Sequence, residues 1–131
     1  MSANDKQVGG SHYQKGAVQH WDLAIEHDIP YTLGCATKYL FRWKDKNGIQ
    51  DLEKAMHYLQ KTRECASTIS KRWTEGAGAA VPIPDYVGAD ERDICRAALE
   101  WDLDSAIDLL SDLIRAAKDD ARSDDPYIPR D

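Results

Sequence analysis

The chain has 131 residues, about the length of one domain; 42% of them are hydrophobic and 31% are charged. This balance excludes a chain that is disordered throughout. The formal net charge of −6 argues against a general binder of nucleic acid or of anionic membranes, because both need a positive field. The charge is uneven: residues 1–75 carry 11 Lys and Arg against 9 Asp and Glu, and residues 76–131 carry 6 against 14. An anionic ligand is therefore expected in the first part.

The amino-terminal stretch has no basic and apolar signal pattern, and no apolar run approaches the roughly 20 residues of a membrane span. Three cysteines, at positions 35, 65 and 95, form no close pair of the disulfide or zinc-site kind. We expect a cytoplasmic protein with reduced thiols and no membrane partner.

The first 43 residues predict a loop followed by two helices. Residues 1–16 hold three glycines and indicate a loop arm. Apolar spacing over 18–28 indicates a short amphipathic helix, which Pro30 ends because it disfavours helix at the preceding residue. Thr32 is then the expected N-cap of a second helix over 33–43.

A polar turn over 44–48 leads to a long central helix, expected over 49–73. Its apolar positions form a heptad-like stripe: Ile49, Leu52, Met56, Leu59, Ala66, Ile69 and Trp73. A helix of this length spans ~38 Å, long for so small a domain. We therefore predict packing against a second copy, and hence a homo-oligomer.

The remaining chain predicts a linker, two helices and a tail. Residues 76–88, with three glycines and two prolines, indicate a linker. A C-terminal helical pair is expected over 89–122, with a corner at Asp102–Asp104, and an extended tail over 123–131. Period-two alternation is not sustained anywhere, so we predict an all-α fold: a helical hairpin with a long central helix, plus the C-terminal pair. Residues 1–75 form the expected main domain.

Candidate functional residues are densest around the predicted hairpin. Lys38 and Arg42 are four apart and share a helical face; Asp51, Lys54 and Tyr58 share a face of the next helix. If the two helices pair, these faces converge, with Tyr39 and Lys46 nearby. Cations beside aromatic rings are the groups that recognise phosphate and a base. The alternative is that the cations are solvated and merely pair with neighbouring carboxylates.

The arm adds His12 and Tyr13, since a histidine in a glycine-bearing loop can donate to phosphate or move a proton. The segment Gly10–Gly16 lacks the GxxxxGK[ST] order, so no P-loop is expected. The histidines at 20, 27 and 57 do not have metal-site spacing, and we expect no metal site in the protein itself.

Four carboxylates recur every fourth residue in the acidic part: Glu100, Asp104, Asp108 and Asp112. Such a row is typical of the solvated face of an amphipathic helix. It is also a set that can hold Mg²⁺ through one or two carboxylates and water.

Several short motifs in order resemble a known family. They are Ser11-His12-Tyr13, Gly34-x-x-x-Lys38-Tyr39-Leu40-x-Arg42, Lys46-x-Gly48, Asp51-Leu52-x-Lys54-Ala55 and Tyr58-Leu59. Over roughly residues 11–60 the chain resembles the small phage-encoded domain of the phage T7-type nucleotide kinase and its relatives, the SaV-like proteins. The resemblance implies phosphoryl transfer between deoxynucleotides without a P-loop, in a large homo-oligomer, and the host cytoplasm as location. Residues 76–131 lie outside it.

Three functions follow as hypotheses. The first is a P-loop-less nucleotide kinase acting on deoxynucleoside monophosphates, with nucleotides as partners and Mg²⁺ accompanying the phosphate donor. In it, His12, Lys38, Arg42 and Asp51 are catalytic, and Tyr13, Tyr39, Lys46, Lys54 and Tyr58 bind substrate. The second is a non-catalytic nucleotide-binding or host-interaction module. The third is an all-α nucleoside-triphosphate pyrophosphatase that uses the acidic row.

Overall fold

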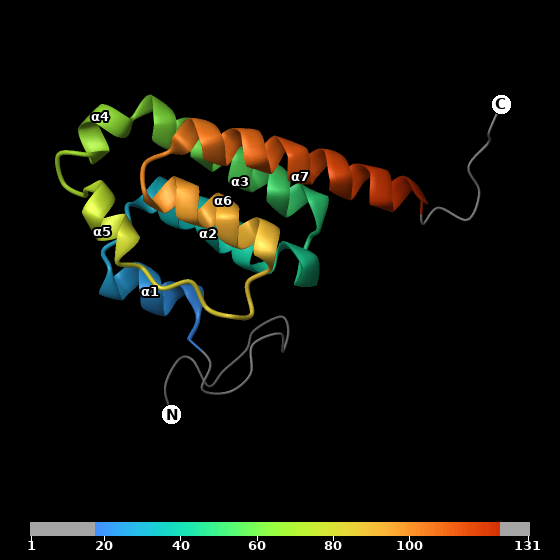
Figure 1. Ribbon diagram of the computed structural model, residues 1–131, viewed down its shortest axis with the longest axis horizontal. Helices are drawn as coiled ribbons and strands as arrows, with labels where there is room; N and C mark the ends of the chain where they lie inside the picture. Colours follow the sequence, from blue (N-terminus) through green and yellow to red (C-terminus); the bar gives the residue numbers. More distant parts are fainter. Residues whose placement is uncertain (1–17, 124–131) are drawn as a thin grey trace.

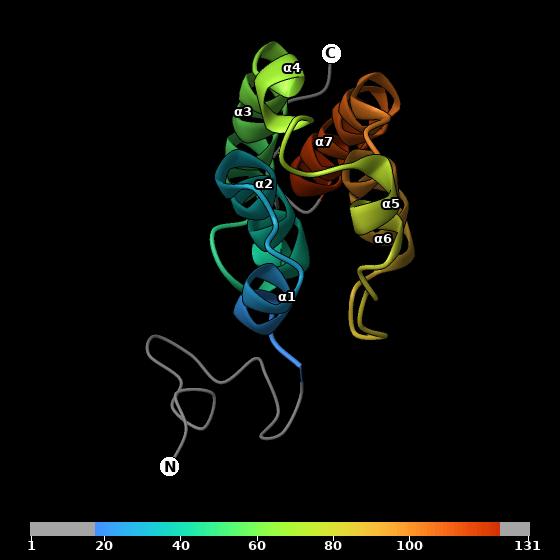
Figure 2. The same ribbon diagram turned by 90° about the vertical axis from the view of Figure 1, so that its left-hand side faces the viewer.

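The computed structural model describes residues 18–123, and within them the chain folds into seven α-helices and one 3₁₀ helix, with no strand. The prediction of an all-α fold is confirmed. Figures 1 and 2 show two packed layers, one made of α2 and α3 and the other of α6 and α7. No helix of the described part is long and apolar enough to cross a membrane.

The first two helices are α1 (His20–Glu26) and α2 (Tyr31–Arg42). The chain turns between them at Asp28, which has a φ of 51°, and at Pro30, which stands at the N-cap of α2. The predicted N-cap at Thr32 is therefore wrong. Pro30 itself takes the N-cap position, with a φ of −55° fixed by its ring, so the helix starts at Tyr31, two residues before the predicted start at Leu33. The Thr32 hydroxyl instead lies 2.9 Å from the hydroxyl of Thr62.

A short connection joins α2 to α3 (Ile49–Glu64): the 3₁₀ helix η2 (Trp43–Asp45) and Gly48. Gly48 has a φ of +62°, which glycine adopts without the steric cost of a side chain. The two helices form the predicted hairpin. Its buried seam is made of small and branched apolar side chains: Leu33, Ala36, Leu40, Leu52, Ala55 and Leu59.

The central helix is shorter than predicted. It ends at Glu64, and a separate turn of helix, α4 (Ala66–Ile69), follows the break at Cys65. The reason is Trp73, which is 5% exposed and donates from its indole nitrogen to the His27 carbonyl at 2.9 Å. A continuous helix would carry Trp73 ~13 Å past Glu64, away from this partner.

The segment predicted as a linker is packed against the core. It contains most of α5 (Glu75–Ala79) and three buried hydrophobic side chains: Val81, Ile83 and Val87. Arg92 donates to the carbonyls of Ile83 and Pro84 at 2.8 and 2.7 Å, and Arg96 donates to the carbonyl of Val81 at 2.7 Å. These bonds satisfy backbone groups that loop residues leave unpaired, which lets an irregular segment lie on the core.

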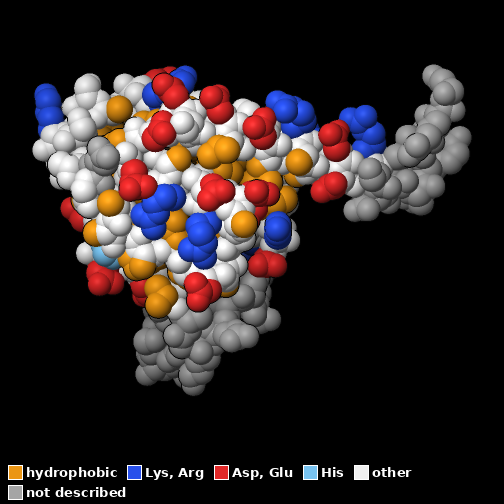
Figure 3. All heavy atoms as spheres, in the orientation of Figure 1, with side chains coloured by type: hydrophobic (Ala, Val, Ile, Leu, Met, Phe, Trp, Pro, Cys, Tyr) orange, Lys and Arg blue, Asp and Glu red, His pale blue; other side chains and the backbone are white. Residues whose placement is uncertain are grey.

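The C-terminal helices are α6 (Ala89–Leu99) and α7 (Leu103–Ser123), as the predicted pair requires. Trp101, with a φ of 67°, makes the corner between them. Helix α7 packs along both α3 and α6, so one hydrophobic core runs through residues from α1 to α7. Acidic side chains lie along the outer sides of α6 and α7, with apolar side chains between them (Figure 3). The predicted tail, apart from the last helical residue, lies outside the described residues.

Candidate functional site

The outer face of the α2–α3 hairpin brings three of the predicted cations around one ring. Measured to the centre of the Tyr39 ring, Lys38 Nζ lies at 5.0 Å, Arg42 Cζ at 5.1 Å and Lys54 Nζ at 5.5 Å. Two of the cations come from α2 and one from α3. The faces expected to converge therefore do meet, with Tyr39 between them.

Tyr58 extends this site along α3. Its ring stacks on that of Tyr39, with centres 6.0 Å apart and an angle of 20° between the planes. Both rings border a shallow hollow of about 520 Å³, which is also lined by Gln50, Glu53, Lys54 and His57; the Glu53 carboxylate lies 3.9 Å from Lys118. The site thus combines positive charge with a flat aromatic surface.

The three cations have no acidic partner in the described part of the chain. Among residues 18–123, none of Lys38, Arg42 and Lys54 takes part in an ion pair within 4.0 Å. The Nε atom of Arg42 is buried and has no hydrogen-bond partner. The rings hold these cations through cation–π attraction, which is weaker than an ion pair with an incoming anion. Their charge is therefore available to a ligand.

Asp51, predicted as catalytic, has a different environment. It is completely buried, and its carboxylate accepts hydrogen bonds from the backbone and side-chain nitrogens of Asn47 at 3.3 and 3.4 Å. It also lies in the first turn of α3, where a negative charge complements the helix dipole. This carboxylate holds the turn that joins the two helices.

Three predicted site residues remain. Lys46 is half-buried in the turn before Gly48. His12 and Tyr13 lie outside the described residues, so their predicted roles stay predictions.

Sequence reasoning did not identify His20 as part of this region. It is 8% exposed, its Nε2 lies 2.7 Å from the Thr37 hydroxyl, and its ring meets the edge of Phe41 at 5.0 Å. Burial, helped by the nearby charges of Lys38 and Arg42, lowers the pKa of His20 to about 4. It is a neutral histidine beneath the cations. The sequence did offer a signal for this burial: His20 lies three residues before Leu23, on the same inner side of α1.

Tyr31 and Cys35 were also missed. Together with Lys38 and Arg42 they follow the spacing four, three, four and so form one stripe along α2. The charge of Cys35 is the main cause that raises the pKa of Tyr58. A hydrogen bond to Cys35 does the same for the pKa of Tyr31. The stripe continues the aromatic surface toward the start of α2.

The acidic row does not gather into a metal site. Within the described residues no group of three or more His, Cys, Asp or Glu side chains is placed to hold a metal ion. Asp104 pairs with Arg63 at 2.8 Å and Asp112 pairs with Arg115 at 3.2 Å, all four side chains being exposed. These contacts match the solvated face of an amphipathic helix.

Comparison with known proteins gives one family match. Residues 8–60 are similar to a family described as a protein of unknown function, DUF3310. The matched range contains α1, α2 and most of α3, and with them every cation and ring of the Tyr39 site. The description gives no activity and makes no link to a nucleotide kinase. No curated protein and no solved structure matches the chain.

Proposed function

We propose that the Tyr39 site binds a nucleotide through its phosphates. The observation that carries the proposal is the convergence of Lys38, Arg42 and Lys54 within 5.5 Å of one aromatic ring, without an acidic partner among the described residues. Arginine offers phosphate a bidentate fork, lysine offers a point charge, and tyrosine rings offer a base a stacking surface. A single nucleotide needs only a local positive patch, so the net charge of −6 is no obstacle.

As a finer proposal, the bound nucleotide takes part in phosphoryl transfer. The resemblance of residues 11–60 to the phage nucleotide-kinase domain supports this step. The γ-phosphoryl group of a nucleoside triphosphate passes to a phosphate oxygen of a deoxynucleoside monophosphate; the bond from Pγ to the bridging oxygen breaks, and two diphosphates result. The cations neutralise phosphate charge, which together with positioning supplies most catalysis of this kind. The same resemblance supports a phage origin and a homo-oligomer.

One observation favours the alternative, a nucleotide-binding module without turnover. Asp51, one of the residues predicted to be catalytic, is completely buried and accepts hydrogen bonds from Asn47, and it does not line the hollow beside Lys54. The hydrogen bonds that hold the turn explain a carboxylate at position 51 without any catalytic role. Binding and turnover therefore need separate measurements.

The binding test compares two double variants of equal charge change. Deoxynucleoside mono- and triphosphates are titrated into the full chain by calorimetry. We expect Lys38→Ala with Arg42→Ala to weaken binding at least tenfold, because each charged hydrogen bond contributes about 1.5–3 kcal/mol. Arg115→Ala with Arg122→Ala, which removes two exposed cations of α7, should leave affinity unchanged. Binding that is absent from the unchanged protein, or equal in both variants, contradicts the proposal.

The turnover test uses the same samples with Mg²⁺ and each pair of donor and acceptor, with diphosphates separated by chromatography. Diphosphate formation that Lys38→Ala with Arg42→Ala abolishes supports the kinase. Saturable binding without any diphosphate supports the module. Light scattering on these samples gives the mass, and a value of 14.8 kDa, that of one chain, contradicts the homo-oligomer.

A further inference from the structure

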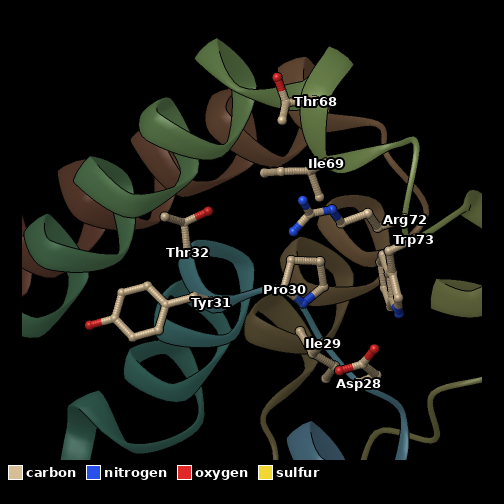
Figure 4. Close-up of a pocket in the computed structure, with 9 residues that line it drawn as sticks. All are labelled: Asp28, Ile29, Pro30, Tyr31, Thr32, Thr68, Ile69, Arg72 and Trp73. Carbon is tan, nitrogen blue, oxygen red and sulfur yellow. The ribbon is translucent and has the colours of Figure 1, made fainter.

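A second pocket lies where the start of α2 meets the segment after α4 (Figure 4). Its volume is about 460 Å³, within the usual range for small-molecule sites. Its apolar wall is made of Ile29, Pro30, Ile69 and Trp73. None of the cations of the Tyr39 site lines it, so it is a separate place for a ligand.

Hydrogen bonds to neighbouring elements fix the position of the pocket wall. Trp73 is 5% exposed and donates to the His27 carbonyl, while the indole nitrogen of Trp101 donates to the Trp73 carbonyl at 3.2 Å. On the other side, the Ile29 nitrogen donates to the Ala24 carbonyl at 3.0 Å. Because both sides are anchored to the core, the pocket is formed before a ligand arrives, which lowers the entropic cost of binding.

Arg72 gives the pocket its charge. Figure 4 shows its side chain reaching inward above Pro30, with the guanidinium group toward Thr32. In the described part of the chain, no carboxylate lies within 4.0 Å of this group. A guanidinium group beside an apolar wall is matched best by a planar anion that takes two parallel hydrogen bonds.

Asp28 limits how much negative charge the ligand can carry. It lines the same pocket on the other side of Pro30 from Thr32 (Figure 4). Asp28 weakens the attraction of Arg72 for any anion, and a dianion such as a phosphate monoester has in addition a larger desolvation cost beside the apolar wall than a singly charged ligand has. The wall beside Arg72 has room for an apolar body.

From these contacts we propose that this pocket binds a small organic monocarboxylate with an apolar or aromatic body, its carboxylate on Arg72 and its body against Ile69 and Trp73. The proposal does not depend on nucleotide binding at the Tyr39 site.

Benzoate is a suitable probe, titrated into the full chain while backbone amide signals are followed by two-dimensional NMR. We expect saturable shifts confined to residues 28–32 and 68–73, with an affinity in the millimolar range for so few atoms. Arg72→Gln should weaken binding about tenfold or more, because it removes the charged fork. The control variant is Lys71→Gln, which removes one positive charge from the neighbouring residue. Because Lys71 does not line the pocket, this variant should bind benzoate as the unchanged chain does.

Two further probes decide the chemistry. Benzyl alcohol has a similar body without charge, and phenyl phosphate carries two charges; both should bind at least several-fold more weakly than benzoate. Absence of saturable shifts up to about 10 mM benzoate overturns the proposal. Equal binding by Arg72→Gln or by benzyl alcohol overturns the role of the charge. Tighter binding of phenyl phosphate overturns the assignment to a monocarboxylate.

Discussion

At the residue scale, spacing was sufficient to predict that Lys38 and Arg42 share one face of their helix, and the prediction that Lys54 meets them depended on the pairing of the two helices. The surroundings of Asp51 and His20 were not predictable in this way. Whether a polar group is buried depends on what packs over it, and the covering residues come from other elements. Burial makes Asp51 a structural carboxylate and His20 a neutral ring.

The lowered pKa of His20 predicts a loss of stability in mild acid. The unfolded chain takes up the proton near the ordinary value of 6.5, and the folded chain only near 4. As pH falls from 6.5 toward 4, the unfolded state is therefore favoured, by about 1.4 kcal/mol for each pH unit. Between pH 6.5 and 5 this amounts to about 2 kcal/mol in the free energy of unfolding.

Urea unfolding at pH 7, 6 and 5 measures this slope. His20→Gln should reduce it, because glutamine does not titrate and can still bond to Thr37. His57→Gln, at an exposed position of α3, is the matched control and should keep the slope. Equal slopes in the unchanged chain and His20→Gln would show that other groups cause the acid sensitivity.

At the element scale, periodicity predicted the helices well and the breaks poorly. The stripe from Ile49 to Leu59 is helical as expected, but Ala66, Ile69 and Trp73 continue the same spacing without continuing the helix. Trp73 meets residues distant in the chain: its indole nitrogen donates to the His27 carbonyl, and its ring meets the edge of the Trp101 ring at 6.0 Å. The spacing of apolar residues along the chain does not specify which partner each of them contacts. The end of α3 therefore depends on tertiary contacts.

The same holds for α5, where Gly78 is one of the three glycines that predicted a linker over 76–88. A Cβ atom at Gly78 would lie 1.6 Å from the Leu99 carbonyl oxygen, so α5 can approach the end of α6 only with glycine there. We expect Gly78→Ala to lower the free energy of unfolding by about 2 kcal/mol or more, the cost of overpacking a close contact.

Gly76 offers the matched comparison within the same short helix. A Cβ there would meet only the Thr74 hydroxyl at 3.8 Å, an ordinary contact. Gly76→Ala should therefore be neutral or stabilise by about 0.4–1 kcal/mol through the unfolded state. Thermal and urea unfolding of both variants check the pair; equal effects would mean that the approach of α5 to α6 is not a tight one.

At the scale of the whole molecule, the two parts with opposite charge form a single packed body. Trp43 after α2 donates to Glu91 of α6 at 3.2 Å, Arg63 of α3 pairs with Asp104 of α7, and the core is continuous across the expected linker. The argument for a homo-oligomer from a 25-residue helix loses its basis, because α3 has 16 residues and its leucines lie in the chain's own core.

The charge of the whole molecule predicts its response to nucleic acid. A chain of net charge −6 whose cations gather locally at Tyr39 should not bind a long duplex at about 0.15 M salt, since duplex binding needs many phosphate contacts. A mononucleotide should still bind, with an affinity that falls as salt rises. Competition of duplex DNA against a labelled deoxynucleotide checks this; strong competition at physiological salt would contradict it.

The sequence by itself determined the helical class, the extents of α2 and of the C-terminal pair, and which cations share a face of α2 or of α3, because helical periodicity is a local property. Tertiary structure decided the end of α3 at Glu64, the packing of residues 76–88, the burial of Asp51 and His20, and the Arg72 pocket. Each of these depends on contacts between residues distant in the chain. The free energy of such a contact depends on the partner, which no local pattern specifies.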